Sequence, residues 1–447
     1  MSGDRTYPPE LEIRPYAGGK LSATVTVPGS KSITNRALVL AALTPMDIDL
    51  ALTGALRSED TEVMVDCLKR LGYPVEPYWN ATDPFVLFPR REWSYVPVQS
   101  ADLFVANSGT TLRFLTAMLA IGRGRYRLDG VPRMRERPVQ DLLDALNQID
   151  GVRAYSELGN GCPPVVVECT GRARAATITA RVGVSSQFLS GLLMAAPRLA
   201  TEDRWVTIRT DGPVVSKPYI EMTVAMMRRW GHEVEQVEGG AYRVGPTSGY
   251  LDVGMYAIEP DASAASYFWA AAAILGGRVT VSGLTEHSLQ GDVAFADVLQ
   301  QMGCRVEKCE SGITVHGGPL RGIDVDMNAI SDTVMTLGAV ACFADGPTRI
   351  RNVAHIRHKE TDRIAALATE LRRLGADVEE FADGLAITPR PLHGAAVETY
   401  NDHRMAMSLA LIGLRVPGVV IKNPGCVAKT YPGFWQDLSR LVLSTAS

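Results

Sequence analysis

The sequence has no long apolar run, no paired cysteines and no large excess of charge of either sign. Its longest apolar stretch, AASYFWAAAAIL (264–275), is too short and too rich in alanine to span a membrane. The seven cysteines are scattered and form no C-x-x-C pair, so neither a disulfide framework nor a zinc site is indicated. A net charge of -4 argues against a broad face for nucleic acid. The opening residues lack the apolar core of a secretory signal peptide, so we expect a cytoplasmic protein.

Motifs for common cofactors are also missing. No G-x-G-x-x-G follows a strand-like run. GSKS (29–32) is not a nucleotide phosphate loop, because the motif G-x-x-x-x-G-K-[ST] needs glycine at residue 30, which is serine. No G-x-S-x-G elbow is present. The pair His355 and His358 has no third metal ligand at a recognisable spacing. We therefore expect neither a metal nor an organic cofactor.

A phrase that recurs along the 447 residues indicates the architecture. LKRLGYPVE (68–76), MMRRWGHEVE (226–235), LQQMGCRVE (299–307) and LRRLGADVEE (371–380) each predict an amphipathic helix that ends at glycine and is followed by a strand. A weaker copy, LNQIDGVRA, begins at residue 146. The glycines are 72 to 80 residues apart, which is too long a period for the usual solenoid repeats.

With the helix-like C-terminal FWQDLSRLVL, these copies define six α/β units, which favour two similar domains of three units each. The division is expected near YAIEPDASAASY (256–267). We assign 27–258 to one lobe and 1–26 plus 259–447 to the other. Two such lobes would place a ligand site in the cleft between them.

The segment VPGSKSITNRAL (27–38) joins a strand-like run to a helix-like one. Ser30 or Ser32 could cap that helix, while Lys31 and Arg36 would stand near its start, where the helix dipole disfavours cations. An anion bound to the free N–H groups would remove this conflict. A capped helix with two solvated cations is the alternative, and the segment alone does not decide between them.

Similar polar clusters stand before other helix-like runs, among them NSGTTLRFL, PRMRERPVQDL, SSQFLSGLL, SKPYIEMTV, SDTVMTL, KETDRIAAL, NDHRMAMSL and AKTYPGFW. Any one of them is an ordinary helix cap. Together they would combine cations and helix N-termini into a site for a small, highly charged anion. Asp332 and Glu360 would be the carboxylates available there for proton transfer.

These motifs, in this order, resemble those of the 5-enolpyruvylshikimate-3-phosphate synthase family, and the resemblance covers roughly residues 20–434. It implies an α/β fold of two similar lobes, each of three βαβαββ units around a pseudo-threefold axis. It also implies transfer of the enolpyruvyl group of phosphoenolpyruvate to the 5-hydroxyl of shikimate 3-phosphate, with release of phosphate. Such an enzyme uses no metal or organic cofactor and is the target of the inhibitor glyphosate.

The resemblance carries roles over to individual residues. It makes Glu360 the proton donor and Asp332 the acceptor, with Lys31 close enough to assist. The implied contacts to shikimate 3-phosphate are Lys31, Ser32, Arg36, Ser185, Ser186, Gln187, Ser216, Tyr219, Asp332, His355 and Lys359. Those to phosphoenolpyruvate are Lys31, Gly109, Arg137, Gln187, Arg363, Arg404 and Lys429.

Two positions depart from the usual family pattern: Phe114 stands where proline is frequent, and His355 where asparagine is frequent.

Three rival functions remain. A related enolpyruvyl transferase acts on UDP-N-acetylglucosamine, but it typically carries a cysteine that GVPRMRERPVQ (130–140) lacks. A non-catalytic anion binder would have no reason to place Asp332 and Glu360 among cations. An RNA-end-processing enzyme on a related repeat scaffold would need a basic groove. We expect a monomer with no membrane or nucleic-acid partner.

Overall fold

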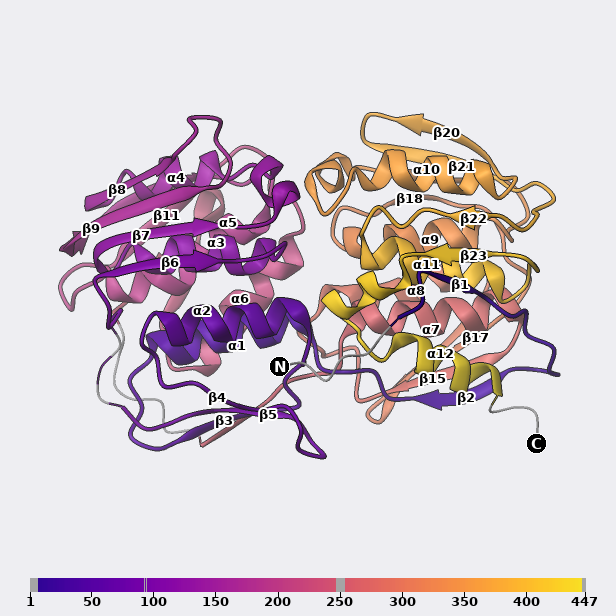
Figure 1. Cartoon of the computed structure of the whole chain (residues 1–447), viewed down its shortest axis with the longest axis horizontal. Coiled ribbons are helices and arrows are strands. Elements are labelled where there is room, and N and C mark those ends of the chain that lie inside the picture. The colour runs from indigo at the N-terminus through magenta and orange to yellow at the C-terminus, as the bar shows by residue number, and fades with distance from the viewer. Residues whose placement is uncertain (1–6, 92, 94, 247–253, 444–447) are drawn as a thin grey trace. The chain divides into compact units, whose positions relative to one another are not determined.

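The computed structural model describes residues 7–91, 93, 95–246 and 254–443, and it divides the chain into two compact units (Figure 1). The first is Gly29–Ile258, here the N-terminal unit. The second joins Met1–Pro28 to Glu259–Ser447 and is here the C-terminal unit. Residues 7–28 therefore fold with the second half of the chain.

The N-terminal unit contains three repeats of the order βαβαββ, each with a four-stranded mixed sheet. In every repeat the first two strands are parallel and the last two form an antiparallel hairpin against the second. The repeats are β14 (Met255–Ala257), α1 (Lys31–Leu43), β3 (Leu50–Thr53), α2 (Glu59–Arg70), β4 (Glu76–Tyr78), β5 (Phe85–Phe88); β6 (Ser100–Phe104), α3 (Gly109–Leu119), β7 (Arg123–Asp129), α4 (Gln140–Leu146), β8 (Asp150–Ser156), β9 (Val165–Arg174); and β10 (Thr177–Arg181), α5 (Ser186–Ala195), β11 (Val206–Asp211), α6 (Lys217–Arg229), β12 (Val234–Val237), β13 (Ala241–Val244).

The C-terminal unit repeats this plan with one change. In its third repeat, β1 from the start of the chain pairs antiparallel with β23, so that sheet has three strands. The repeats are β2 (Ser22–Val25), α7 (Ala262–Leu275), β15 (Arg278–Ser282), α8 (Phe295–Gln301), β16 (Arg305–Cys309), β17 (Gly312–His316); β18 (Asp324–Asp326), α9 (Val334–Ala341), β19 (Thr348–Arg351), α10 (Arg363–Arg373), β20 (Asp377–Phe381), β21 (Gly384–Thr388); and β22 (Ala396–Val397), α11 (His403–Gly413), β23 (Val420–Lys422), α12 (Phe434–Leu443), β1 (Glu10–Glu12). The expected α/β fold of two similar three-repeat lobes is confirmed.

The first helix of each repeat lies inside its unit. α3 and α9 are buried along their whole length, and α7 is buried from Ala262 to Ile274. Their sequences are rich in alanine and other apolar residues, as expected for helices without a solvent face. The three inner helices of each unit also pack against one another. Each unit therefore carries three helix N-termini that belong to its core.

The recurring phrases are the second helices of the repeats. α2, α6, α8 and α10 each end two residues before a glycine with positive φ, and a strand follows. These glycines are Gly72, Gly231, Gly303 and Gly375, and the left-handed conformation is one that glycine adopts at little cost. The predicted helix–glycine–strand pattern is thus confirmed.

The chain passes between the units at two points, and Gly29 lies at the first of them. A Cβ on Gly29 would overlap the carbonyl oxygen of Gly54 and come within 3.3 Å of Ile258 Cγ2. Both neighbours belong to the N-terminal unit. Only glycine fits at this position without moving the backbone of its neighbours.

Among the helices of the described ranges, none is long and apolar enough to cross a membrane.

We predict that Gly29→Ala lowers the free energy of unfolding by about 1–3 kcal/mol, because the added methyl group overpacks a site bounded by backbone atoms. Gly19→Ala is the matched control, since a Cβ at Gly19 meets no atom within 4 Å. Thermal unfolding of both variants measures the effect. Equal midpoints for Gly29→Ala and Gly19→Ala would contradict this account of the crossing.

Candidate active site

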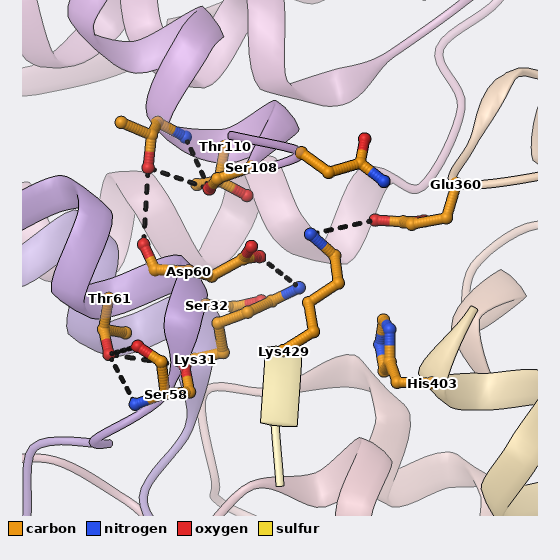
Figure 2. A network of polar contacts seen from close by, with 12 residues as sticks. Lys31, Ser32, Ser58, Asp60, Thr61, Ser108, Thr110, Glu360, His403 and Lys429 are labelled. Carbon is orange, nitrogen blue, oxygen red and sulfur yellow. Dashed lines mark hydrogen bonds and ion pairs between the residues drawn. The ribbon is translucent and has the colours of Figure 1, made fainter. Parts of the chain in front are cut away.

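Lys31 is the first residue of α1, and Ser30 caps the helix by accepting a hydrogen bond from the N–H of Ile33 (3.4 Å). Of the two serines expected as caps, Ser30 has this role. Lys31 Nζ lies 3.3 Å from Asp60 Oδ2, in the first turn of α2 (Figure 2). The cation at the helix start is therefore offset by a nearby carboxylate, which the sequence had not indicated.

Asp60 is held from two sides. Ser58 and Thr61 form a capping box at the start of α2, with the Ser58 N–H donating to Thr61 Oγ1 (3.0 Å). Thr111 Oγ1 in α3 donates to the backbone oxygen of Asp60 (3.4 Å) and shares a hydrogen bond with the cap Ser108 (2.8 Å). Together with the Lys31–Asp60 ion pair, these bonds join the starts of α1, α2 and α3.

Arg36 is almost completely buried and uses its guanidinium within the protein. Its Nε donates to Thr223 Oγ1 (2.7 Å), and its Nη2 donates to Ser190 Oγ (3.2 Å) and to the backbone oxygen of Tyr219 (3.1 Å). Its Nη1 donates to the backbone oxygen of Ser32 (3.0 Å). Arg36 thus links α1 to α5 and α6 and fixes the backbone of two other residues with a predicted role, Ser32 and Tyr219.

The aromatic ring of Phe114 supports this buried cation. The guanidinium carbon of Arg36 lies 5.1 Å from the centre of the ring, within the range of a cation–π interaction. Burial lowers the pKa of Arg36 to about 10, so the side chain is still charged at neutral pH. Phe114 is itself fully buried in α3.

Gly109 and Arg137 lie in contact. Arg137 Nη1 donates to the backbone oxygen of Asn107 (3.1 Å), just before α3 begins. A Cβ on Gly109 would lie 2.5 Å from Arg137 Nη2, so the guanidinium occupies the space that a side chain would need. Glycine at the first position of α3 therefore allows an arginine to lie against a helix N-terminus.

The start of α5 is tied to α3 through Gln187. Gln187 Nε2 donates to Thr110 Oγ1 (3.1 Å), and its Oε1 accepts from Arg113 Nη1 (2.7 Å). Ser185 caps α5 by accepting from the Gln187 N–H (3.2 Å), and Ser186 follows it as another buried hydroxyl. The hydroxyl and amide groups predicted from the motifs thus lie together at the N-termini of the inner helices.

Ser216 precedes α6 in the left-handed conformation, with φ of 51°. This conformation is uncommon for a residue other than glycine and recurs near functional sites. Ser216 is buried, whereas the next residue, Lys217, pairs with Glu221 (3.2 Å) and has a half-exposed side chain. Ser216 and Tyr219 therefore belong to the inner face of the helix start, and Lys217 to its outer face.

The arginine-rich loop is held by Asp129 at the end of β7. Arg135, in the 3-10 turn η1 (Pro132–Glu136), donates through Nε to Asp129 Oδ1 (2.9 Å) and through Nη2 to Oδ2 (2.7 Å). Burial alone would raise the pKa of Asp129, but the bonds from Arg135 and the Gly130 N–H, with the charge of Arg127, hold it below its usual value. This clamp fixes the loop that carries Arg137.

In the C-terminal unit, an aspartate stands at the start of each inner helix. Asp261 caps α7 and accepts from the Ala264 N–H (2.9 Å). Asp402 caps α11 and accepts from the Arg404 N–H (2.9 Å). Asp332 lies in the 3-10 turn η5 (Ser331–Thr333), directly before α9. The three repeats thus place a carboxylate at equivalent positions.

Arg363 joins these carboxylates. It is fully buried at the start of α10 and donates to Asp402 through Nε (2.8 Å), to Asp332 through Nη1 (3.1 Å) and to Glu360 through Nη2 (2.9 Å). Burial alone would lower its pKa, but the three carboxylates more than offset this and raise it above the usual value. A single buried cation therefore orients three acidic groups.

Further cations surround Asp332 and Glu360. Arg404 Nη2 lies 2.8 Å from Asp332 Oδ2, and Lys359 Nζ lies 3.8 Å from Asp332 Oδ1. Lys429, at the end of the 3-10 turn η7 (Pro424–Lys429), places Nζ 3.8 Å from Glu360 Oε1 (Figure 2). Both predicted proton-transfer groups thus contact arginine or lysine, as in a site that binds an anion next to a carboxylate.

His355 lies beside this cluster in the 3-10 turn η6 (Ala354–His358), and its Nε2 is 2.9 Å from Ser331 Oγ. Burial, assisted by the charge of Lys359, lowers the pKa of His355 to about 4. The ring is therefore neutral at pH 7 and serves as a hydrogen-bonding group. His403 is also buried, with Nδ1 3.6 Å from Asp402 Oδ1.

Every residue with a predicted role lies at the N-terminal end of a helix or in a turn next to one, except Arg36, which is one turn further into α1. The structure adds partners that sequence reasoning missed. They are Asp60, Ser190 and Thr223 in the N-terminal unit and Ser263 and Asp292 in the C-terminal unit. For Ser190 and Thr223 the sequence offers only a lone hydroxyl in an apolar helix, in FLSGLL and EMTVAM, and this does not identify the partner.

We predict that Asp129→Asn destabilises the protein at pH 7 and that the difference disappears in acid. The folded pKa of Asp129 lies below its unfolded value of about 3.9. Its stabilisation is therefore complete above that value and is lost as the pH falls through the lower folded pKa. Thermal midpoints of both proteins between pH 7 and about pH 2 measure this, because the loss extends below the unfolded pKa. A difference that stays constant with pH, or an equal effect of Asp83→Asn at an exposed carboxylate, would contradict it.

Comparisons with known proteins place this chain in a family. Residues 15–438 match the family model described as EPSP synthase (3-phosphoshikimate 1-carboxyvinyltransferase). A 3-phosphoshikimate 1-carboxyvinyltransferase of Trichormus variabilis is 47% identical over 429 residues, covering 96% of this chain and 98% of that protein. One of Paraburkholderia phytofirmans is 44% identical over 439 residues, covering 96% and 99%.

Solved structures share the fold. An EPSP synthase from Acinetobacter baumannii matches with a TM-score of 0.77 at 24% identity, covering 97% of this chain and 98% of that one. The enolpyruvyl transferase NikO from Streptomyces tendae matches with a TM-score of 0.74 at 19% identity, covering 96% of each. Because the family model matches nearly the whole chain, and relatives with more than 40% identity cover it, this chain belongs to the EPSP synthase family.

Proposed function

We propose that this chain transfers the enolpyruvyl group of phosphoenolpyruvate to the 5-hydroxyl of shikimate 3-phosphate and releases phosphate. The observation that carries the proposal is that Asp332 and Glu360 each lie among cations, with Arg363 in contact with both. An anionic substrate bound to such cations would have a proton donor and a proton acceptor beside it. Family membership gives the substrates, and the cluster supplies groups suited to them.

The charges of the two substrates fit the residues. Each carries a phosphate and a carboxylate, and the candidate residues supply arginines, lysines and helix N-termini, which bind such groups through charge-assisted hydrogen bonds. We propose that these groups bind the two substrates. Gly109, Arg137, Gln187, Arg363, Arg404 and Lys429 would bind phosphoenolpyruvate; Ser32, Arg36, Ser185, Ser186, Gln187, Ser216, Tyr219, Asp332, His355 and Lys359 would bind shikimate 3-phosphate; and Lys31 would contact both.

The reaction is an addition followed by an elimination. The 5-hydroxyl oxygen bonds to the central carbon of phosphoenolpyruvate while Glu360 delivers a proton to the methylene carbon, and Asp332, assisted by Lys31, takes the hydroxyl proton. The tetrahedral intermediate then loses phosphate, and the methyl carbon returns its proton to Glu360 as the double bond re-forms. The cations stabilise the charge that develops on the departing phosphate, as preorganised dipoles and charges do in other transfer reactions.

UDP-N-acetylglucosamine is the nearest alternative acceptor, and the relatives do not favour it. The loop of η1 also lacks the cysteine typical of enzymes that use it. A non-catalytic anion binder is a second alternative, against which the paired carboxylates argue. We further propose that the protein acts as a monomer, because one chain supplies all the residues given a role. The cytoplasm is the location that we propose for it.

Phosphate release tests the proposal. With phosphoenolpyruvate, no added metal and either shikimate 3-phosphate or UDP-N-acetylglucosamine as acceptor, we expect release only with shikimate 3-phosphate. In Glu360→Gln, turnover should fall by about 10²–10⁴-fold, the range for losing a positioned acid or base, while shikimate 3-phosphate still binds. Glu379→Gln, at an exposed position of β20, is the control and should keep full activity.

Two results would count against this function. Release with UDP-N-acetylglucosamine alone would reassign the acceptor. Release with neither acceptor would mean that the clusters bind anions without catalysis. Unchanged turnover in Glu360→Gln would remove that residue from its role and leave Asp332 and Lys31 as the groups to test.

We predict that Gly109→Ala raises the KM for phosphoenolpyruvate by about tenfold or more, the loss expected for one disturbed charge-assisted hydrogen bond. The added methyl group would lie 2.5 Å from Arg137 Nη2, so the guanidinium must move. Steady-state kinetics measure the effect, and Gly19→Ala serves again as a glycine with free space around it. An unchanged KM, with Arg137 displaced in a crystal structure, would separate Arg137 from this substrate.

A further inference from the structure

A chain of four polar side chains from separate segments runs through the C-terminal unit. Asp292, in the 3-10 turn η4 (Gly291–Ala294), accepts a hydrogen bond from Ser263 Oγ, in the first turn of α7. Ser263 Oγ accepts from Arg404 Nη2 (3.4 Å), in the first turn of α11. The same Nη2 lies 2.8 Å from Asp332 Oδ2. Asp292 and Ser263 have no part in the proposed binding or proton transfer.

The order of donors and acceptors in this chain is fixed by Asp292. A serine hydroxyl has one proton to donate, and an ionised carboxylate can only accept. With the Ser263 proton directed to Asp292, the lone pairs of Ser263 Oγ are available to Arg404, which can only donate. Removing the carboxylate would free the hydroxyl to rotate, so its lone pairs would no longer be held toward Arg404.

Asp292 is held against α7 by its own segment. Gln290 Oε1 accepts from the N–H of Ala262 (3.0 Å), and Gln290 Nε2 donates to the backbone oxygen of Pro260 (2.6 Å). Glu259 accepts from the N–H of Leu289 (3.1 Å). These bonds dock the segment 289–292 on the start of α7, so the carboxylate has little freedom to follow a moving partner.

Burying this carboxylate is unfavourable by itself. Asp292 is 2% exposed, and burial, together with the negative charge of Asp332, raises its pKa to about 6. Asp261 is a further carboxylate nearby, while the Ser263 hydrogen bond and the charge of Arg404 favour the ionised form. A buried acid that faces two other acids stabilises the fold poorly, which points to a role in arranging its neighbours.

We propose that Asp292 is a positioning residue, which acts through Ser263 to hold the Arg404 guanidinium in place for phosphoenolpyruvate and against Asp332. This inference rests on the proposed function, in which Arg404 binds that substrate. It assigns no contact with substrate to Asp292 or Ser263.

Ser263→Ala and Asp292→Asn test the proposal, with Ser263→Thr as the variant that keeps the hydroxyl. In Ser263→Ala the KM for phosphoenolpyruvate should rise by about tenfold, as expected for one lost hydrogen bond to a charged group, and the KM for shikimate 3-phosphate should change much less. Asp292→Asn should act in the same direction, and Ser263→Thr should restore most of the wild-type value. A purely structural role would lower the active fraction, and so kcat, while leaving both KM values unchanged.

Crystal structures of wild type and Ser263→Ala keep the two hypotheses apart. A displaced Arg404 guanidinium in the variant supports the positioning role, whereas an unmoved guanidinium or unchanged KM values for all variants would overturn it. If wild type releases no phosphate, the proposed function fails, and the position of Arg404 in Ser263→Ala still decides this inference. Should Asp292→Asn not fold, the KM values of Ser263→Ala and Ser263→Thr are enough to support or overturn the positioning role.

Discussion

The ion-pair group around Arg363 is the interaction on which the C-terminal cluster depends. One fully buried guanidinium holds Asp332, Asp402 and Glu360, which come from three different turns. A buried charge is tolerated only when it is paired and hydrogen-bonded, and here each charge provides the compensation for the others. Removing Arg363 would leave three carboxylates close together in the interior. The four charged groups therefore depend on one another, and the buried Arg363 guanidinium sets the orientation of the three carboxylates.

The two units use the same repeat with different helix caps. In the N-terminal unit the inner helices start at Ser30, Ser108 and Ser185, and the first turns of these three described helices contain no acidic residue. Their positive ends are left for an anion, and Lys31 and Arg137 add charge nearby. In the C-terminal unit Asp261, Asp332 and Asp402 stand at the helix starts, and arginines pair with Asp332 and Asp402. Neutral caps suit binding of anions, and acidic caps with paired arginines suit proton transfer beside them.

The positions of the site motifs could be predicted from the sequence because caps are local. Serine or aspartate before an apolar run marks a helix start wherever it occurs, and the recurring glycine phrases indicated six repeats. The partners could not be predicted, because they are far away in the chain: Arg36 meets Thr223 across 187 positions, and Arg404 meets Ser263 across 141. Nothing in EMTVAM marks its threonine as the acceptor of a buried arginine. The pairing of β1 with β23 is hidden for the same reason, since only the folded chain brings residues 10–12 beside residues 420–422.

The two crossings of the chain explain why Lys31 and Ser263 lie close to residues 28 and 259. β2 lies before the first crossing but pairs with β15, which follows the second crossing. β14 lies just before the second crossing but pairs with β3, which follows the first. Since an inner helix follows the first strand in every repeat, α1 and α7 must begin directly after the crossings, at Lys31 and Ala262. The Asp261 N–H donates to the backbone oxygen of Pro28 (2.8 Å), so the end of the first segment is tied to the cap of α7. Connectivity, and not only side-chain chemistry, thus fixes where Lys31 and the Ser263–Asp292 pair can stand.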